Sequence, residues 1–569
     1  MPELTGGEAA VRMLQLHGIE YSFGMAGFQP LPYYDALARQ DQIRHILIRD
    51  EKHGAFMADG YARIKNRPAV ADATLGPGAT NLISGLAEAY GASTPLIALT
   101  GEVNSLIGGR AATQESDQFG MLRPTAKMSI AVDRIERIPE LFRRALTVAT
   151  TGRPGPVHLN VREDVMHGRY DFPESELYAA PEALAATRPR VRADATAIDR
   201  AAAALSHAQR PVLLAGGGIH LSEACQELTA LAELTGITVA TTMSGKGAIT
   251  EQHPLSIGLF GRYSRFANEM IKEADVLLVA GCKLGEIATS RWTLFRPDTT
   301  IVQIDIDPTE LGKVYRTDHG LWGDAKLALA DLAQALASDR ARMRERAARQ
   351  AAEIEQRRRV WLGDAEPKYH SAERPIHNAR LLHELRSALP PDAILVADGG
   401  FAAHWSGLLY DVQVPGRTYI ANRGHAAIGY GLPGAIGAKL AAPDRVVVAL
   451  CGDNGFAMAL AEVETARRVG APVIAVIVDN QTLGYVKALQ HSLYEDRFIS
   501  VDFLDVDYGA VARAFGCFGA RVDDPDQLGP VLREAIASGE TAVIDVIVTT
   551  NPAEMLPGID ARVATGSRQ

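Results

Sequence analysis

Residues 446–486 read VVVALCGDNGFAMALAEVETARRVGAPVIAVIVDNQTLGYV, which has the pattern of one βαβ unit. Val and Ile dominate two short runs at 446–450 and 473–480, as is typical of buried parallel strands. A helical spacing of apolar residues lies between them and ends at Arg468, before Gly470. A right-handed crossover places both strands in one sheet, so the residues that follow each strand are expected at the same edge.

The same alternation of strand-like runs and helical patterns extends over almost the whole chain. The runs end in Gly, Asp or Asn, which indicates parallel strands whose carboxyl ends carry functional loops. We therefore predict an α/β protein with three doubly wound parallel-sheet domains. Further strands are predicted at 95–101, 211–218, 276–281 and 300–307.

Two segments predict the domain boundaries. Residues 170–190 are rich in Pro, Ala and Glu, and residues 340–370 contain a long, highly charged helix with i,i+4 ion pairs. The predicted units are domains at 1–170, 190–335 and 371–553 and a C-terminal tail at 554–569.

Composition excludes several classes of function. The formal net charge of −10 gives no reason to expect nucleic acid. No apolar run reaches the roughly 18 residues that a membrane-spanning helix needs, and the N-terminus predicts a capped amphipathic helix in place of a secretory signal. The four cysteines are widely spaced, which favours buried reduced thiols and a cytoplasmic location.

The loops after the two strands of the 446–486 unit suit a magnesium diphosphate. Mg²⁺ prefers hard oxygen ligands, and Asp453 can supply a carboxylate and Asn480 an amide oxygen. Gly452 and Gly455, which flank Asp453 and Asn454, let the backbone approach phosphate groups, and the following helix presents its N-terminus to them.

A second pair of motifs lies near the N-terminus. Residues 49–63 read RDEKHGAFMADGYAR, and residues 74–81 read TLGPGATN. The first predicts a helix with a carboxylate, Glu51, in its first turn, and the second predicts a tight turn and a helix start.

Together these motifs resemble those of the thiamine diphosphate (ThDP) enzymes, in particular the acetolactate synthase-like group, over nearly the whole chain. The family motif reads GDG, a spacer, then NN; here GDN at 452–454 is followed by 25 residues and then Asn480. Asp479 stands where the family has its first Asn, and Asn454 replaces the third Gly. The resemblance implies that Asp453, Asn480 and the carbonyl of Thr482 bind Mg²⁺.

The resemblance also implies roles for residues of the pyrimidine-binding and diphosphate-binding domains. Glu51 would bind N1′ of the aminopyrimidine, so that the 4′-nitrogen can take the proton from C2 of the thiazolium. Ile428 would force the cofactor into its bent shape, and His425 is the preferred acid–base candidate over His53, His404 and His491. The remaining cofactor contacts would be Gly27, Thr74, Pro77, Asn81, Gly400, Gly484 and Tyr485.

On the substrate side the chain departs from the acetolactate synthase pattern. Gln114 matches a family residue near the reacting carbonyl, but Phe28 and Gln29 replace two small residues of the family. Tyr485 replaces a Met, Leu489 falls where a Trp helps to select the second keto acid, and Phe401 and Ala402 replace a Gln-His pair. These changes indicate a different acceptor site.

The middle domain has a Gly216-Gly217-Gly218 run, and Asp305 or Asp307 could bind a ribose hydroxyl. The resemblance leaves FAD, ADP or an empty domain open.

The activity that the resemblance implies is decarboxylation of a 2-keto acid, followed by ligation of the resulting enamine to a second carbonyl. The alternatives are a 2-hydroxyacyl-CoA lyase or oxalyl-CoA decarboxylase-like enzyme that acts on an acyl-CoA, and a ThDP-binding homologue without activity. In relatives the site lies between two subunits, which predicts a homodimer or a dimer of dimers.

Overall fold

The structure, a computed structural model, describes residues 3–180, 184, 189–337 and 340–558. It contains three six-stranded sheets, and every neighbouring pair of strands within them is parallel. The predicted α/β class with three parallel sheets is therefore confirmed. A two-stranded antiparallel pair, β1 (Glu3–Thr5) with β8 (Arg169–Asp171), completes the sheets of the described chain.

The chain divides into two compact units. The first comprises Met1–Pro189, Asn422–Asp444 and Met458–Val473, and the second comprises Arg190–Ala421, Arg445–Ala457 and Ile474–Gln569. The second unit holds both the central and the C-terminal sheet. Residues 559–569, most of the predicted tail, lie outside the described residues.

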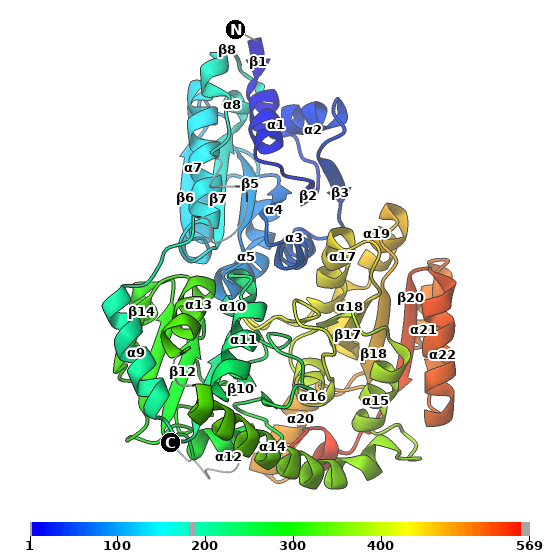
Figure 1. The fold of residues 1–569 in the computed structure, drawn as a ribbon. Helices are drawn as coiled ribbons and strands as arrows, with labels where there is room; N and C mark the ends of the chain where they lie inside the picture. The colour runs from blue at the N-terminus through cyan, green and yellow to red at the C-terminus, as the bar shows by residue number, and fades with distance from the viewer. Residues whose placement is uncertain (1–2, 181–183, 185–188, 338–339, 559–569) are drawn as a thin grey trace. The chain divides into compact units, whose positions relative to one another are not determined.

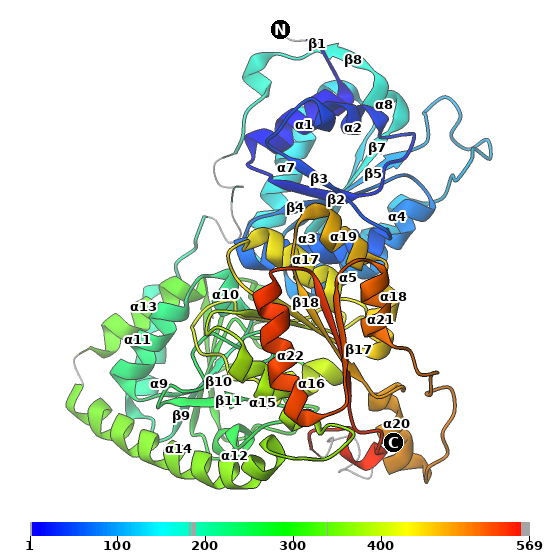
Figure 2. The same ribbon diagram turned by 90° about the vertical axis from the view of Figure 1, so that its right-hand side faces the viewer.

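The first unit is built on one sheet with the order β3-β2-β4-β5-β7-β6. Figure 2 shows α1 on one side of this sheet and α3 and α5 on the other. The strands are β2 (Tyr21–Gly24), β3 (Arg44–Leu47), β4 (Ala69–Ala73), β5 (Leu96–Glu102), β6 (Met128–Val132) and β7 (Pro156–Arg162). The helices are α1 (Gly6–Leu16), α2 (Leu31–Ala38), α3 (Glu51–Lys65), α4 (Pro77–Asn81), α5 (Ile83–Ala92), α6 (Gln118–Leu122), α7 (Ile138–Thr150), α8 (Glu163–His167), α17 (Gly431–Ala441) and α19 (Glu462–Val469).

The central sheet of the second unit has the order β11-β10-β9-β12-β13-β14 and helices on both faces (Figure 1). Leu213 of β9 packs with α9, α11 and α13, whereas its neighbours Val212 and Leu214 pack with α12, as alternation along a strand requires. The strands are β9 (Pro211–Ala215), β10 (Thr238–Thr241), β11 (Ser256–Leu259), β12 (Val276–Ala280), β13 (Thr300–Asp305) and β14 (His319–Trp322). The helices are α9 (Ala195–His207), α10 (Gly218–Leu221), α11 (Cys225–Thr235), α12 (Ala267–Lys272) and α13 (Ala325–Leu336).

The C-terminal sheet has the order β16-β15-β17-β18-β20-β19. The predicted charged helix forms α14 (Arg340–Tyr369) and precedes this sheet. The strands are β15 (Ile394–Ala397), β16 (Tyr419–Ala421), β17 (Val447–Gly452), β18 (Ile474–Asp479), β19 (Phe518–Val522) and β20 (Ala542–Ile547). The helices are α15 (Asn378–Ala388), α16 (Phe401–Leu409), α18 (Asp453–Ala459), α20 (Gly484–Tyr494), α21 (Tyr508–Ala514) and α22 (Pro525–Ser538).

Counted from the first strand of each sheet, the N-terminal and C-terminal sheets share one strand order, 2-1-3-4-6-5, although their sequences are not visibly similar. In such sheets the order reverses between the first and third strands, and ligands bind in the crevice outside that point. The reversal lies between β2 and β4 in the N-terminal sheet and between β15 and β17 in the C-terminal sheet. The topology therefore predicts two half-sites, one at the N-terminal sheet and one at the C-terminal sheet.

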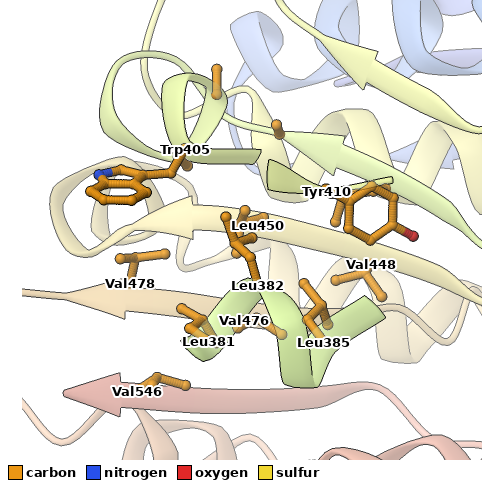
Figure 3. Close-up of a cluster of buried hydrophobic side chains, with 14 of the residues drawn as sticks. Leu381, Leu382, Leu385, Trp405, Tyr410, Val448, Leu450, Val476, Val478 and Val546 are labelled. Atoms are coloured by element: carbon orange, nitrogen blue, oxygen red, sulfur yellow. The ribbon is translucent and has the colours of Figure 1, made fainter. Parts of the chain in front are cut away.

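The core of the C-terminal domain fixes the strands that carry one of these half-sites. Leu381, Leu382 and Leu385 of α15 lie over β17 and β18, where they meet Val448 and Val476 (Figure 3). These side chains are almost completely buried, and each contributes about 1.5–3 kcal/mol of hydrophobic stabilisation.

Local elements largely follow the sequence patterns, with two differences. The predicted N-terminal helix is α1, with a capping box between Thr5 and Glu8. The single helix predicted between β17 and β18 is wrong in detail, because two helices form there and the first already begins at Asp453. Three cysteines are buried as expected, but Cys225 is only half-buried. Among the described residues, no helix combines the length and apolar character needed to cross a membrane.

Candidate active site

The loops after β2 and β4 meet at the reversal point of the N-terminal sheet. A Cβ atom on Gly27 would lie 2.3 Å from Oγ1 of Thr74, so only glycine permits this approach. Thr74 Oγ1 also donates a hydrogen bond to Oε1 of Gln29 at 2.9 Å. Gly27 and Thr74, which were predicted as cofactor contacts from separate motifs, therefore lie together.

Glu51 is the first residue of α3 and is only 7% exposed. Asn81 donates a hydrogen bond from Nδ2 to Glu51 Oε2 at 3.0 Å, and a Cβ atom on Gly78 would lie 3.1 Å from Glu51 Oε1. The positive end of the helix dipole favours a carboxylate at this position. The structure thus brings together Glu51 and Asn81, with Pro77 at the start of the same short helix, α4, as Asn81.

Gln118, which the sequence analysis did not single out, holds the turn that leads to α4. Its fully buried side chain accepts a hydrogen bond from Gly76 N at 2.7 Å and donates to Asn160 Oδ1 at 2.7 Å. The predicted residue Gln114 is exposed and has a φ of 64°. Its backbone lies so close that a Cβ atom on Gly76 would be 2.4 Å from Gln114 O. Gln114 and Gln118 are only four residues apart and look alike in sequence, so no pattern could have separated their roles.

Segment 422–430 carries the predicted residues His425 and Ile428. His425 is exposed and Ile428 is half-buried. Glu88 of α5 accepts hydrogen bonds from the backbone N–H groups of Gly424, His425 and Ala426 at 2.8, 2.6 and 3.0 Å. No sequence pattern marks Glu88 as a functional residue, because a Glu in a helix is normally solvent-exposed.

In the second unit, Asp453 and Asn480 converge on a single N–H group. Thr482 N lies 3.2 Å from Asp453 Oδ2 and 3.4 Å from Asn480 Oδ1, as a hydrogen-bond donor to both. Asp453 Oδ1 accepts a hydrogen bond from Asn454 N at 2.6 Å. All three predicted metal ligands are therefore neighbours. Gly452 ends β17, and Gly455 lies in the first turn of α18.

Burial raises the pKa of Asp453 to about 7, and the nearby charge of Asp479 adds to this effect. A buried carboxylate with such a raised pKa is one that a cation would stabilise. The donor set of carboxylate, amide and carbonyl oxygens therefore fits Mg²⁺. Among the described residues, no group of three or more His, Cys, Asp or Glu side chains could hold a metal ion.

Asp479, at the position where the family has Asn, faces a second buried acid. Burial and the neighbouring Asp479 raise the pKa of Asp545 to about 8, and burial raises the pKa of Asp479 as well. Asp479 Oδ1 accepts a hydrogen bond from Gln481 N at 3.0 Å. Asp479 and Asp545 can share one proton. The replacement of the family's Asn by Asp479 then adds less than a full negative charge next to Asn480.

Several departures from the family pattern lie together beside Asn480. A Cβ atom on Gly484 would lie 2.5 Å from Asn480 Nδ2 and 3.2 Å from the ring of Phe401. Tyr485 stacks on His404 with a distance of 5.1 Å between the ring centroids, and its hydroxyl accepts a hydrogen bond from Arg262 Nη1 at 2.9 Å. Phe401 thus lies beside Gly484, and Tyr485 is the next residue of the same helix, α20. Gly400, which precedes α16 at the reversal point, has a φ of 70° that favours glycine.

In the central domain the predicted nucleotide residues have structural partners. Gly216 N donates to Ala280 O and Gly218 N donates to Gly281 O, both at 3.0 Å, so these two N–H groups are not free to bind phosphate. A Cβ atom on Gly218 would lie 2.6 Å from Gly281 Cα. The N–H groups of Gly216 and Gly218 thus serve the close packing of two loops. Asp305 and Asp307 accept hydrogen bonds from the backbone N–H groups of Asp307 and Thr309.

Comparison with known protein families covers all three domains. The model described as "Thiamine pyrophosphate enzyme, N-terminal TPP binding domain" matches residues 4–121. The models for the central domain and the C-terminal TPP binding domain of the same enzymes match residues 198–332 and 398–546.

Curated relatives cover nearly the full length of the chain. A probable acetolactate synthase large subunit of Methanocaldococcus jannaschii is 37% identical over 557 residues, which is 97% of this chain and 93% of the relative. The acetolactate synthase large subunits of Parasynechococcus marenigrum and Corynebacterium glutamicum are 34% and 32% identical; they match 96% and 98% of this chain and 88% and 89% of their own lengths. The chain therefore belongs to the thiamine pyrophosphate enzymes, in their acetolactate synthase-like group.

Proposed function

We propose that this protein is a ThDP- and Mg²⁺-dependent carboligase that decarboxylates a 2-keto acid and joins the remaining acyl unit to a second carbonyl compound. The observation that carries the proposal is the buried Glu51 carboxylate held by Asn81 at the reversal point of the N-terminal sheet. Family membership supplies the cofactor class, and this geometry supplies the group that the cofactor needs.

The pyrimidine half-site would bind and orient the ring of the cofactor. Glu51 would hold a proton at N1′ of the aminopyrimidine, while Asn81 keeps its carboxylate from rotating. Ile428 would support the bent form of the cofactor, which brings its two rings together. When bound, ThDP supplies a thiazolium that acts as the electron sink for bond cleavage next to a carbonyl.

The diphosphate half-site would bind the metal and the phosphate groups. Asp453, the amide oxygen of Asn480 and the carbonyl of Thr482 would bind Mg²⁺, which would offset the negative charge of the diphosphate. The convergence of the first two on Thr482 N and the raised pKa of Asp453 support this assignment. Gly452, Asn454 and Gly455 would lie along the phosphates at the start of α18.

The relatives favour a 2-keto acid over an acyl-CoA as substrate. The relatives described above are named acetolactate synthases, so the lyase alternative is not favoured. Phe401 beside Gly484 and Tyr485 stacked on His404 support an acceptor that differs from that of the family pattern. Gln114, near Gly76, remains a proposed contact of the reacting carbonyl, and the exposed His425 remains the preferred acid–base candidate. Retention of Glu51, Asp453 and Asn480 argues against a homologue without activity.

We further propose a homodimer or a dimer of dimers, in which a second copy completes each half-site, as the resemblance to the family implies. We also propose that the three domains are separated at residues 170–190 and 340–370. For the central domain, the order 3-2-1-4-5-6 of its strands supports a nucleotide, FAD or ADP, whereas the bonded N–H groups of Gly216 and Gly218 oppose binding at the glycine run.

The test is turnover of pyruvate, a simple 2-keto acid, by the purified protein with ThDP and Mg²⁺. We expect release of carbon dioxide and a carbon–carbon ligation product, both lost in Glu51→Gln while the thermal midpoint stays unchanged. Full activity of Glu51→Gln would contradict the assigned role. Turnover of 2-hydroxyacyl-CoA in place of any 2-keto acid would favour the lyase alternative.

A further inference from the structure

Segment 422–430 is fastened to helices α3 and α5 at both ends by buried charges. At its start, Glu88 accepts three backbone hydrogen bonds, from Gly424, His425 and Ala426. At its end, Tyr430 donates a hydrogen bond to Asp59 Oδ2 at 2.6 Å. Ile428 lies between the two attachments.

A single arginine connects the two acids. Arg63 Nη2 donates to Glu88 Oε1 at 2.7 Å, and Arg63 Nε lies 2.7 Å from Asp59 Oδ2. Glu88 and Asp59 are fully buried, and the Arg63 side chain is only 5% exposed. A buried ion pair is a poor source of stability, because desolvation offsets most of the attraction between the charges. We therefore expect that Asp59, Arg63 and Glu88 serve to fix the geometry of the segment more than to stabilise the fold.

Burial alone would raise the pKa of Glu88, but Arg63 and the backbone N–H groups lower it below its usual value. Glu88 is thus a carboxylate wrapped by three backbone N–H groups, while burial raises the pKa of Asp59. The wrapping requires a tight turn, and the φ angles of Ala426 (61°) and Gly429 (91°) both lie in the left-handed region.

Close backbone packing leaves this segment little freedom. A Cβ atom on Gly424 would lie 2.1 Å from Glu88 O. Beyond the segment, α17 packs directly on α3, since a Cβ atom on Gly437 would lie 1.9 Å from Met57 O. Helix α3 also carries Glu51, so the same framework sets the positions of Glu51 and Ile428.

We propose that Glu88 is a positioning residue, whose carboxylate fixes the 424–428 backbone and thereby holds Ile428 where it supports the cofactor. This inference rests on the proposed function for the cofactor contact alone; the attachment of the segment to Glu88 is independent of it.

The decisive substitution is Glu88→Gln, because it keeps the shape of the side chain. Two carboxylate oxygens accept four donors here: Oε1 accepts Arg63 Nη2 and Gly424 N, and Oε2 accepts the N–H groups of His425 and Ala426. A glutamine offers one oxygen, so two of the donors would face an NH₂ group. Glu88→Asp keeps both oxygens on a shorter stem, and serves as the conservative rescue and as the substitute variant if Glu88→Gln does not fold.

Ser22→Ala is the matched control in the same unit. It removes two buried hydrogen bonds, from Ser22 Oγ to Asp72 Oδ2 at 2.6 Å and from the Tyr33 hydroxyl to Ser22 Oγ at 2.9 Å, and neither partner belongs to segment 422–430. Comparison with this variant separates a loss of position from a general loss of stability.

Two readouts test the proposal. Hydrogen exchange of the peptide covering 422–430 should become faster by about tenfold or more in Glu88→Gln, less so in Glu88→Asp, and stay unchanged in Ser22→Ala. The dissociation constant for ThDP with Mg²⁺ should rise by about tenfold in Glu88→Gln and remain near the wild-type value in Ser22→Ala.

Unchanged exchange in Glu88→Gln, or an equal loss of ThDP affinity in Ser22→Ala, would overturn the proposal. A wild-type protein that binds no ThDP would instead refute the proposed function, and the exchange measurement would still decide whether Glu88 holds the segment.

Discussion

Nδ2 of Asn81 lies 3.0 Å from Oε2 of Glu51 and donates a hydrogen bond to it, although the two residues belong to separate motifs. A carboxylate that must meet a ring nitrogen needs one orientation, and this amide restricts its rotation. Removal of the Asn81 side chain should therefore impair the orientation of the Glu51 carboxylate.

Asn81→Ala should lower kcat by about tenfold or more, since a hydrogen bond to a charged group is worth about 1.5–3 kcal/mol. The rate of carbon dioxide release at saturating ThDP measures this effect. The matched control is Thr80→Ala in the same short helix, where the hydroxyl donates a hydrogen bond to Pro77 O. An Asn81→Ala enzyme as fast as the control would show that Glu51 needs no such support.

Gly27→Ala should weaken ThDP binding by about tenfold or more. The added Cβ atom would lie 2.3 Å from Thr74. The backbone shift that relieves such a clash costs about 1–3 kcal/mol of free energy. Gly285→Ala is the control, because its Cβ atom would meet no atom within 4 Å. Binding titrations of both variants measure the difference. Equal affinities for ThDP would contradict the assignment of the β2–β4 reversal point to the cofactor.

The free energy of unfolding should fall as the pH drops below neutral, partly because of His158. Burial lowers the pKa of His158 to about 3, whereas the unfolded chain titrates near 6.5, so the unfolded state binds more protons below that pH. The loss between about pH 7.5 and about pH 5.5 is about 1.4 kcal/mol for this residue. Denaturant titrations of His158→Gln should show a pH dependence smaller by that amount; an unchanged pH dependence would mean that His158 is accessible to protons in the folded protein.

Lys246→Met should destabilise the second unit by about 3–5 kcal/mol. Lys246 and Glu251 form an ion pair with side chains only 1% and 4% exposed, and Glu251 Oε2 also accepts a hydrogen bond from Val412 N at 2.7 Å. Without Lys246, a buried carboxylate is left unpaired. The comparison is Arg137→Met, which breaks an exposed pair with Glu140 and should leave the thermal midpoint unchanged. Similar midpoints for the two variants would contradict this account.

The sequence predicted those parts of the molecule that depend on local pattern. The six quoted strand runs, the charged helix α14 and the capped helix α1 all form, because hydrophobic periodicity and capping residues act within a few positions. The motif spacing also brought Asp453 and Asn480 together, since adjacent parallel strands end at one edge of their sheet.

Pattern could not predict contacts that depend on tertiary packing. Glu88 and Gln118 are polar residues on helices, and only the fold shows that one binds the backbone of 424–426 and the other binds Gly76. For the glycine run at 216–218, the sequence pattern suggested a binding role where the structure shows a packing role. It resembles a nucleotide motif, yet Gly218 is required by its approach to Gly281.

The central claim is that ThDP and Mg²⁺ bind together through Asp453, while Glu51 acts on the bound cofactor. Calorimetric titration of ThDP into the purified protein tests it most directly, with wild type, Asp453→Asn and Glu51→Gln each measured with and without Mg²⁺. We expect saturable, Mg²⁺-dependent binding in wild type, its loss in Asp453→Asn, and retained binding without turnover in Glu51→Gln. Binding that needs no Mg²⁺, or that survives in Asp453→Asn, would contradict it.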